Sequence, residues 1–201
     1  MGRPKEHDEA TRERLLQAAE RLSATKGWDA VTVRAVAEAA ATSTRAVYAL
    51  FGSKEGLEQA LHEAMFTRLR DLERARARRN DPRADLLELS MAYRRWAVER
   101  PERYALAMHR FVGRHARSRS EEGLAVSREA LAELVDVVDR CHQAGIIDGD
   151  PADVVIDLRA VVHGLAEFEN LGLLGPDPER HWRTAISSVL DGCLRRSSAA
   201  A

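Results

Sequence analysis

Residues 32–57 of the chain read TVRAVAEAAATSTRAVYALFGSKEGL, and their pattern indicates the architecture of the first third of the protein. Val36, Ala37 and Ala40 recur at helical spacing, which predicts a short helix. Thr32 stands immediately before this helix, where its hydroxyl can cap the first turn.

A second short helix is predicted after a turn at residues 41–42. Ser43 is well placed to cap it, and Val47 and Phe51 can face inward while Gly52 ends it. Two short helices joined by a turn, the second with small and polar residues at its outer N-terminus, are typical of a DNA-binding helix-turn-helix. Short side chains there let the backbone approach the major groove, and a few donors reach the base edges.

This segment resembles the DNA-binding domain of the TetR family of transcriptional regulators. The matching residues are Thr32, Val36, Ala37, Ser43, Val47, Tyr48, Phe51, Lys54 and Leu57, preceded by a helix that ends at Lys26–Gly27. The family usually has Gly-Val in the turn, where this chain has Ala41-Thr42. If residue 41 takes the left-handed conformation, alanine there costs about 1 kcal/mol relative to glycine.

The helix-turn-helix predicts which residues meet DNA. Arg45 is the best candidate for a guanine, because its guanidinium matches the O6 and N7 acceptors. We expect Ser43 to cap the recognition helix and Thr44 to approach bases beside Arg45. Tyr48 and Lys54 are expected to hold phosphates. The full predicted set is Thr32, Arg34, Ser43, Thr44, Arg45, Tyr48 and Lys54.

Composition favours an all-α protein. The 201 residues are 45 % apolar and 31 % charged, and only six are proline. Such a length allows one large or two small domains with a proper core. The formal net charge of −1 argues against a general polyanion binder, so any DNA contact must come from local placement of cations.

Metal and catalytic sites are not indicated. Cys141 and Cys193 lie far apart and are expected to be buried apolar residues rather than a disulfide framework. His109 and His115, and the adjacent Cys141 and His142, do not have metal-ligand spacing. Neither a nucleophile–histidine–acid pattern nor a glycine-rich phosphate loop is present, so we expect no enzyme, cofactor or metal.

The N-terminal residues MGRPKEHDEATRER contain no apolar core of a signal peptide, and no stretch approaches 18 apolar residues. We therefore expect a cytoplasmic protein without a membrane span. Arg3 and Lys5 give residues 1–6 a basic character. That arm either contacts a minor groove or phosphate, or is a disordered tail.

Prolines and glycines mark helix ends along the chain. The expected helices outside the helix-turn-helix are 8–26, one from Lys54 onward, 83–99, 102–115, 120–144, 151–172 and 178–196, which gives nine in all. The expected domains are a helix-turn-helix domain at 1–54 with an arm at 1–7, a connecting helix at 55–80 and an effector-binding and dimerisation domain at 81–201. The predicted fold class is all-α, a nine-helix TetR-like fold with a three-helix DNA-binding domain.

Seven arginines and three acids lie between Arg68 and Arg83. Beside a DNA-binding unit, this run could be a second DNA contact. A solvated helix end and linker is the favoured interpretation.

The stretch QAGIIDGDPADVVIDLRAVVHGLAEFENLGLLG, from Gln143 to Gly175, resembles a TetR-family C-terminal domain of the type marked by Trp-His-Gly. Here the tripeptide is Val162-His163-Gly164. By this resemblance, the last two helices pair with those of a second subunit in a four-helix bundle, which would bury their abundant apolar surface. The interface candidates are Val155, Leu158, Val162, Leu165, Trp182, Ile186, Val189, Leu190 and Leu194.

A ligand pocket is expected in the same domain, with apolar walls and one or two polar anchors. Its candidates are Tyr93, Trp96, Tyr104, Met108, Phe111, His163, Glu167 and Phe168. Such aromatic stripes are more often plain core, and His163 is interpreted as structural rather than as an anchor.

Together these features predict a homodimeric repressor that a small molecule releases from a palindromic operator. The alternatives are an effector-independent DNA-binding dimer, or an α-bundle interaction protein that has lost DNA binding.

Overall fold

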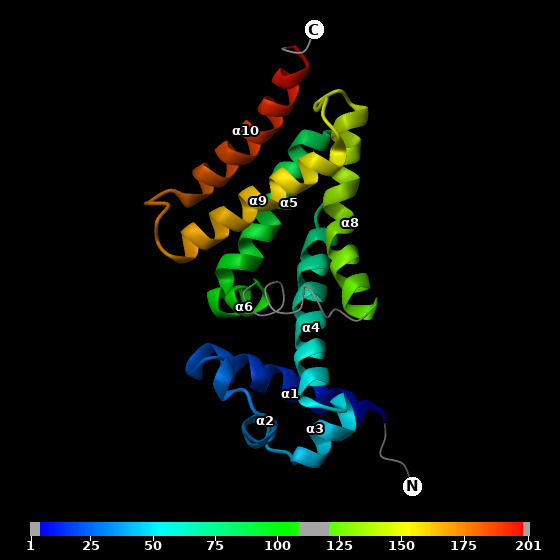
Figure 1. Cartoon of the computed structure of the whole chain (residues 1–201), viewed down its shortest axis with the longest axis vertical. Helices are drawn as coiled ribbons and strands as arrows, with labels where there is room; N and C mark the ends of the chain where they lie inside the picture. The colour runs from blue at the N-terminus through cyan, green and yellow to red at the C-terminus, as the bar shows by residue number, and fades with distance from the viewer. Residues whose placement is uncertain (1–4, 109–120, 199–201) are drawn as a thin grey trace. The chain divides into compact units, whose positions relative to one another are not determined.

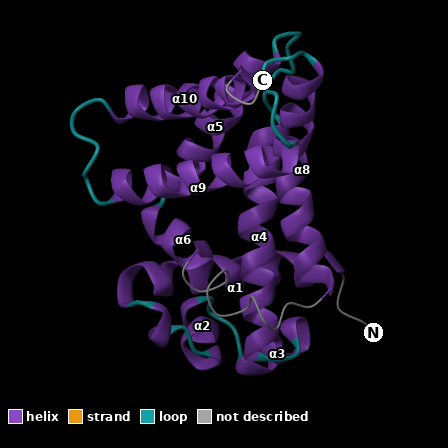
Figure 2. Ribbon diagram, turned by 45° about the horizontal axis from the view of Figure 1, so that its top comes forward, coloured by secondary structure: helices purple, strands orange, loops and turns teal. Residues whose placement is uncertain are grey.

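The computed structural model describes residues 5–108 and 121–198, and within these ranges it contains nine α-helices and no strand (Figures 1 and 2). The helices are α1 (Lys5–Lys26), α2 (Val33–Ala39), α3 (Thr44–Phe51), α4 (Lys54–Arg74), α5 (Pro82–Glu99), α6 (Pro101–Ala105), α8 (Glu121–Gln143), α9 (Pro151–Asn170) and α10 (Pro178–Ser198). A short 3-10 helix, η1 (Trp28–Ala30), joins α1 to α2. The all-α prediction is confirmed.

Helices α5 and α9 begin as their sequences predict. The Asp81 carboxylate accepts the N–H of Ala84 at 3.1 Å, and the Asp150 carboxylate accepts the N–H of Ala152 at 2.9 Å. Proline follows each cap, where its missing N–H costs nothing. The predicted helix at 102–115 is only partly described: α6 ends at Ala105, a π-helical turn covers 106–108, and residues 109–115 lie outside the described residues.

The chain divides into two compact units. Unit 1 comprises residues 1–66 and 102–124, and unit 2 comprises residues 67–101 and 125–201. Helix α4 therefore begins in unit 1 and ends in unit 2. The segment after Pro101 returns to unit 1, so α6 packs with the helix-turn-helix part of the sequence.

Unit 1 is built on apolar residues at helical spacing in α1 to α4. Its core side chains, none more than 2 % exposed, include Leu15, Leu16, Val36, Val47, Leu57 and Leu61. Helices α2 and α3 lie against α1 (Figure 1). An ion pair joins α6 to α1, between Arg103 and Glu20, which is only 5 % exposed.

Unit 2 has its own core between α5, α8, α9 and α10. Fully buried side chains include Leu86, Val137, Val138, Cys141, Leu158, Trp182, Ile186 and Leu190. Cys141 and Cys193 are both buried and are not disulfide-bonded, as predicted. Burial raises the pKa of the Cys141 thiol to about 11, so this side chain behaves as an apolar residue.

Candidate nucleic-acid interface

Side-chain caps fix the starts of the two helix-turn-helix helices. The Ser43 hydroxyl accepts the backbone N–H of Ala46 at 3.2 Å at the start of α3. The Thr32 hydroxyl accepts the N–H of Ala35 at 3.1 Å at the start of α2. Both cap residues have extended backbone conformations, as N-caps require. Gly52, with φ of 74°, ends α3. These local predictions are confirmed.

The turn between α2 and α3 carries backbone strain at Ala41, which has φ of 51°. Its N–H bonds to the carbonyl of Glu38 at 3.0 Å, and the N–H of Thr42 bonds to the carbonyl of Ala37 at 2.9 Å. These are the two hydrogen bonds of a Schellman motif. Glycine usually occupies the left-handed position because a Cβ is disfavoured there. In this chain alanine holds it.

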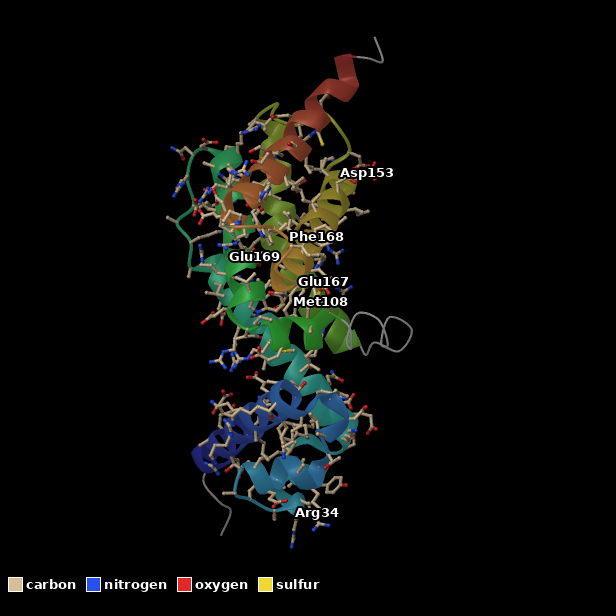
Figure 3. All side chains as sticks on the ribbon, turned by 90° about the vertical axis from the view of Figure 1, so that its left-hand side faces the viewer. Arg34, Met108, Asp153, Glu167, Phe168 and Glu169 are labelled. Atoms are coloured by element: carbon tan, nitrogen blue, oxygen red, sulfur yellow. The ribbon has the colours of Figure 1, made fainter. Side chains whose placement is uncertain are left out.

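The predicted DNA-binding residues lie on the caps, α2, α3 and the first residue of α4, and six of the seven are exposed: Thr32, Arg34, Ser43, Thr44, Arg45 and Tyr48. Lys54 is half-buried, and its amine lies 3.9 Å from the Glu58 carboxylate. In the part of the chain that the structure describes, neither Arg34 nor Arg45 is paired with an acid. Figure 3 shows Arg34 on the outer side of α2, pointing away from α1. Unit 1 therefore presents two guanidinium groups to solvent around the recognition helix.

Two contacts that sequence patterns did not identify hold α3 and α4 in place. The Arg12 guanidinium of α1 lies 5.7 Å from the centroid of the Phe51 ring, at the end of α3. A cation over an aromatic face is attracted by the ring's negative charge distribution. The Ser53 hydroxyl caps α4 by accepting the N–H of Gly56 at 3.0 Å. The serine cap could have been found from local sequence, but the Arg12 contact joins residues far apart in the chain.

The arginine-rich stretch is paired with acidic residues of α8, which lies beside the C-terminal part of α4 (Figure 1). The ion pairs are Arg70–Glu129 at 2.8 Å, Arg74–Glu133 at 3.7 Å, Arg76–Glu133 at 3.4 Å and Arg78–Asp136 at 2.5 Å. We call these four pairs the arginine ladder. Because carboxylates already neutralise these arginines, the ladder favours the helix-end interpretation over a second DNA contact. It fastens the end of α4 to α8.

Asp85 anchors the linker between α4 and α5. Its fully buried carboxylate accepts the N–H of Arg79 at 3.0 Å and Nη1 of Arg140 at 2.7 Å. Arg140 also donates to the carbonyl of Arg79 at 2.6 Å. Burial alone would raise the pKa of Asp85, but the hydrogen bonds from Arg140 and the Arg79 N–H outweigh it and lower the pKa. Asp85 is therefore a buried, fully partnered negative charge.

Two polar contacts tie α5 to α9 in unit 2. The Tyr93 hydroxyl lies 2.7 Å from Nδ1 of His163. Burial lowers the pKa of His163 to about 4, helped by the charge of Arg159, so the imidazole is neutral at pH 7. The Tyr93 ring also meets the Trp96 ring, at 5.5 Å between centroids. Polar anchors and aromatic surface are thus brought together.

The second contact involves Glu169. Its carboxylate accepts Nη2 of Arg94 at 2.5 Å and Nε of Arg94 at 2.9 Å, and it accepts Nε1 of Trp182 in α10 at 2.7 Å. The hydrogen bonds that Arg94 donates to Glu169 raise the pKa of Arg94, which stays charged. One carboxylate therefore joins α5, α9 and α10. No sequence motif distinguishes Glu169 from Glu167, two residues before it.

The pocket candidates fall in different parts of the structure. Tyr93, Trp96, His163, Glu167 and Phe168 belong to unit 2, whereas Tyr104 and Met108 belong to unit 1. Phe111 lies outside the described residues. Phe168 is 53 % exposed, so its expected place in an interior pocket is corrected. Figure 3 shows Glu167, Phe168 and Glu169 together at one end of α9.

The dimer candidates divide between the core and the surface of unit 2. Leu158, Val162, Trp182, Ile186 and Leu190 are at most 8 % exposed within the single chain. Side chains buried in their own subunit are not available to a second copy, so their assignment to a dimer surface is corrected. Val155, Leu165 and Val189 are half-buried. Leu194 belongs to α10, but its side chain lies outside the described part of the structure.

Among the described residues, no group of three or more His, Cys, Asp or Glu side chains is arranged to hold a metal ion. No described helix is both long and apolar enough to cross a membrane.

Comparisons with known proteins agree with this architecture. A family profile described as "Bacterial regulatory proteins, tetR family" matches residues 15–61, and one described as "Tetracyclin repressor-like, C-terminal domain" matches residues 86–189, just over half of the chain. The second match covers the helices that hold the Tyr93–His163 and Arg94–Glu169 contacts. No curated protein sequence gives a significant match.

Solved structures resemble the chain over most of its length. A Rhodococcus sp. RHA1 protein of unknown function is 27 % identical, with a TM-score of 0.80 over 92 % of this chain and 95 % of that one. A TetR family transcription regulator from Marinobacter aquaeolei VT8 is 25 % identical, with a TM-score of 0.76 over 94 % of this chain and 97 % of that one. A TetR family regulator from Thermus thermophilus, 21 % identical with a TM-score of 0.69 over 89 % and 97 % of the two chains, shares the fold. The profile matches and the helix-turn-helix geometry establish that the chain is a DNA-binding transcriptional regulator that belongs to the TetR family.

Proposed function

We propose that this regulator is a cytoplasmic homodimeric repressor that binds a palindromic operator and is released from it by a small molecule. The observation that best supports sequence-specific DNA binding is the exposed surface around α3. The guanidinium groups of Arg34 on α2 and Arg45 on α3 have no acidic partner among the described residues, and the start of α3 is fixed by the Ser43 cap. A dimer would bring two such helices to successive major grooves about 34–36 Å apart.

The candidate DNA-binding residues have roles that follow from their positions. Arg45, in the first turn of α3, reads a guanine through its two parallel donors, and Thr44 beside it approaches a neighbouring base. Tyr48 and Lys54 bind phosphates, with Thr32 and Arg34 assisting at the start of α2.

Mobility shift across a salt series tests this proposal, with DNA from upstream of the protein's own coding region. Arg45→Ala is expected to cost about 1–3 kcal/mol and to relax preference at one operator position. Lys54→Ala should weaken binding to DNA of every sequence equally and reduce the salt dependence of the affinity. Equal loss on every sequence for Arg45→Ala would make Arg45 a phosphate contact. A sequence-selective loss for Lys54→Ala would contradict its phosphate role.

We place the dimer contact on the outer face of α9. Ile156 is 61 % exposed and Phe168 is 53 % exposed, and the small residues Ala160 and Gly164 lie between them at four-residue spacing. That spacing keeps all four on one side of the helix. Large apolar side chains on either side of two small ones suit close approach of a second helix. A twofold axis would bring the same face of a second copy against it.

Gly164→Arg tests the dimer contact. A Cβ at Gly164 would meet nothing within 4 Å, and arginine favours a helix over glycine by up to about 1 kcal/mol, so the single chain should fold at least as well. We expect the unaltered protein to sediment as a dimer and the variant as a monomer. The matched control is Ala132→Arg at an exposed position of α8, which should stay dimeric. A dimeric Gly164→Arg protein would exclude this face.

We place effector recognition in unit 2, around Tyr93 and His163. A neutral imidazole, a hydroxyl and the Trp96 ring suit an uncharged ligand with aromatic or apolar surface and one polar group. Release requires that the ligand bind the DNA-free state more tightly than the DNA-bound state, since equal affinity shifts nothing. Compounds can be screened by release of the shifted DNA, and Tyr93→Phe is expected to weaken release while leaving DNA affinity intact.

Two other functions give different results in the same assays. An effector-independent dimer would bind operator specifically, but no compound would release it. An interaction protein that has lost DNA binding would show negligible affinity for DNA at every salt concentration.

A further inference from the structure

Glu73 is a buried acid near the C-terminal end of α4, within unit 2. Its side chain is 5 % exposed, and its Oε2 accepts no hydrogen bond from the residues that the structure describes. Arg76, two residues beyond the end of α4, buries its Nε, which likewise donates to no described acceptor. A buried polar atom without a partner costs free energy. Two unpartnered buried atoms three residues apart mark a place where the side chains could pair differently.

The charged groups that act on Glu73 are Arg76 and, from α8, Glu133. Arg76 is already paired through Nη2 with Glu133 at 3.4 Å, and Arg74 shares the same carboxylate at 3.7 Å. Burial raises the pKa of Glu73 to about 8; Arg76 opposes this rise and Glu133 adds to it. Glu73 is therefore mostly uncharged at pH 7.

The charge on Glu73 determines which carboxylate forms an ion pair with Arg76. While Glu73 is protonated, Arg76 and Glu133 keep the ladder pair that joins the end of α4 to α8. When Glu73 loses its proton to solvent, a second carboxylate competes for Arg76 and repels Glu133. A buried charge is stable only when it is paired, so the ionised form favours an arrangement in which Glu73 takes Arg76 or becomes exposed.

We propose that Glu73 is a proton-sensitive positioning residue: its neutral form holds the C-terminal end of α4 on α8, and its ionised form releases that end. Helix α4 directly follows the helix-turn-helix and ends at the arginine ladder. Release would therefore leave the C-terminal end of this helix without its contacts to α8. The effect on operator affinity rests on the proposed function, whereas the release itself does not.

Hydrogen exchange of the full-length protein at pH 6 and pH 8, with and without Glu73→Gln, tests the release. Glutamine has the shape of glutamic acid and stays neutral, and Glu129→Gln is the control that removes an exposed ladder acid. In the unaltered protein, residues 67–80 and the facing turns of α8 should exchange about 10- to 50-fold faster at pH 8, after correction for intrinsic rates. In Glu73→Gln the change should stay within about twofold. Glu129→Gln should keep the full pH response.

Operator affinity measured at the same two pH values separates the two proposals. A pH-dependent loss of affinity that Glu73→Gln abolishes and Glu129→Gln retains supports the positioning role. Exchange in residues 67–80 that is equally fast at both pH values, or equally pH-dependent in Glu73→Gln, overturns it even if DNA binding is intact. Absence of DNA binding at both pH values overturns the proposed function, while exchange still reports on Glu73. If Glu73→Gln does not fold, Glu73→Met provides a second uncharged side chain of similar length.

Discussion

Replacing Ala41 with glycine should stabilise the protein, although the substitution removes a side chain. The residue has φ of 51°, where a Cβ costs roughly 1–2 kcal/mol. Glycine has more conformational freedom in the unfolded chain, and this entropy reduces the stabilisation by about 0.4–1 kcal/mol. The hydrogen bonds of the turn are backbone bonds and remain. The net expectation is a stabilisation of about 0.5–1 kcal/mol, or about 1–4 °C in Tm.

The matched control is Ala39→Gly. This residue is exposed and lies two positions earlier, at the end of α2. The chemical change is identical, but the backbone is helical, so the control should lose up to about 1 kcal/mol. Urea unfolding followed by circular dichroism measures both variants, at one protein concentration because the proposed dimerisation would make apparent stability concentration-dependent. If Ala41→Gly destabilises the protein as much as Ala39→Gly does, the strain assigned to the turn does not exist.

Two further predictions concern buried and capping groups. Asp85→Ala should cost about 3–5 kcal/mol in urea unfolding, because it leaves the Arg140 guanidinium without its buried partner. The pKa of Asp85 in the folded protein lies below the ordinary aspartate value of 3.8. Its stabilisation is therefore present above pH 3.8 and is lost as the pH falls from 3.8 through the lowered pKa, so the variant should lose less stability than the unaltered protein between pH 5 and pH 3. Equal acid sensitivity in both would contradict the buried charge. Ser43→Ala should cost about 1 kcal/mol through loss of the α3 cap, and Ser43→Thr should restore most of it. Unchanged stability in Ser43→Ala would show that solvent satisfies the α3 N-terminus equally well.

Local chemistry explains why the helices and their caps were predictable. A cap and the N–H that it satisfies lie two or three residues apart, as Asp81 and Ala84 do, so both are visible in one short window. The exposed positions of Thr44 and Arg45 follow in the same way, once Val47 has been assigned to the core. Backbone strain at Ala41 could also be predicted from the sequence, because the turn between the two helices places a left-handed residue at that position.

Tertiary partnerships were not predictable because nothing local encodes them. Arg76 is one of seven arginines in its stretch, and only the packing of α8 shows that it meets Glu133. The apolar composition of α9 likewise predicts that this helix packs against other elements, but it does not show which face packs in the core of unit 2. The chain carries large apolar residues on both sides of this helix. Leu158 faces inward and Phe168 outward, so a choice based on hydrophobicity alone selects the wrong side for several positions.

The arginine ladder also bears on how the protein associates with DNA in general. Its cations are cancelled by acids a few ångströms away, and the formal net charge of the whole chain is −1. Beyond a Debye length of about 8 Å, paired charges of opposite sign produce little field. Long-range steering and sliding along arbitrary DNA both depend on unpaired cations. The protein is therefore expected to release non-specific DNA quickly, and its residence at a site depends on the contacts made by α2 and α3.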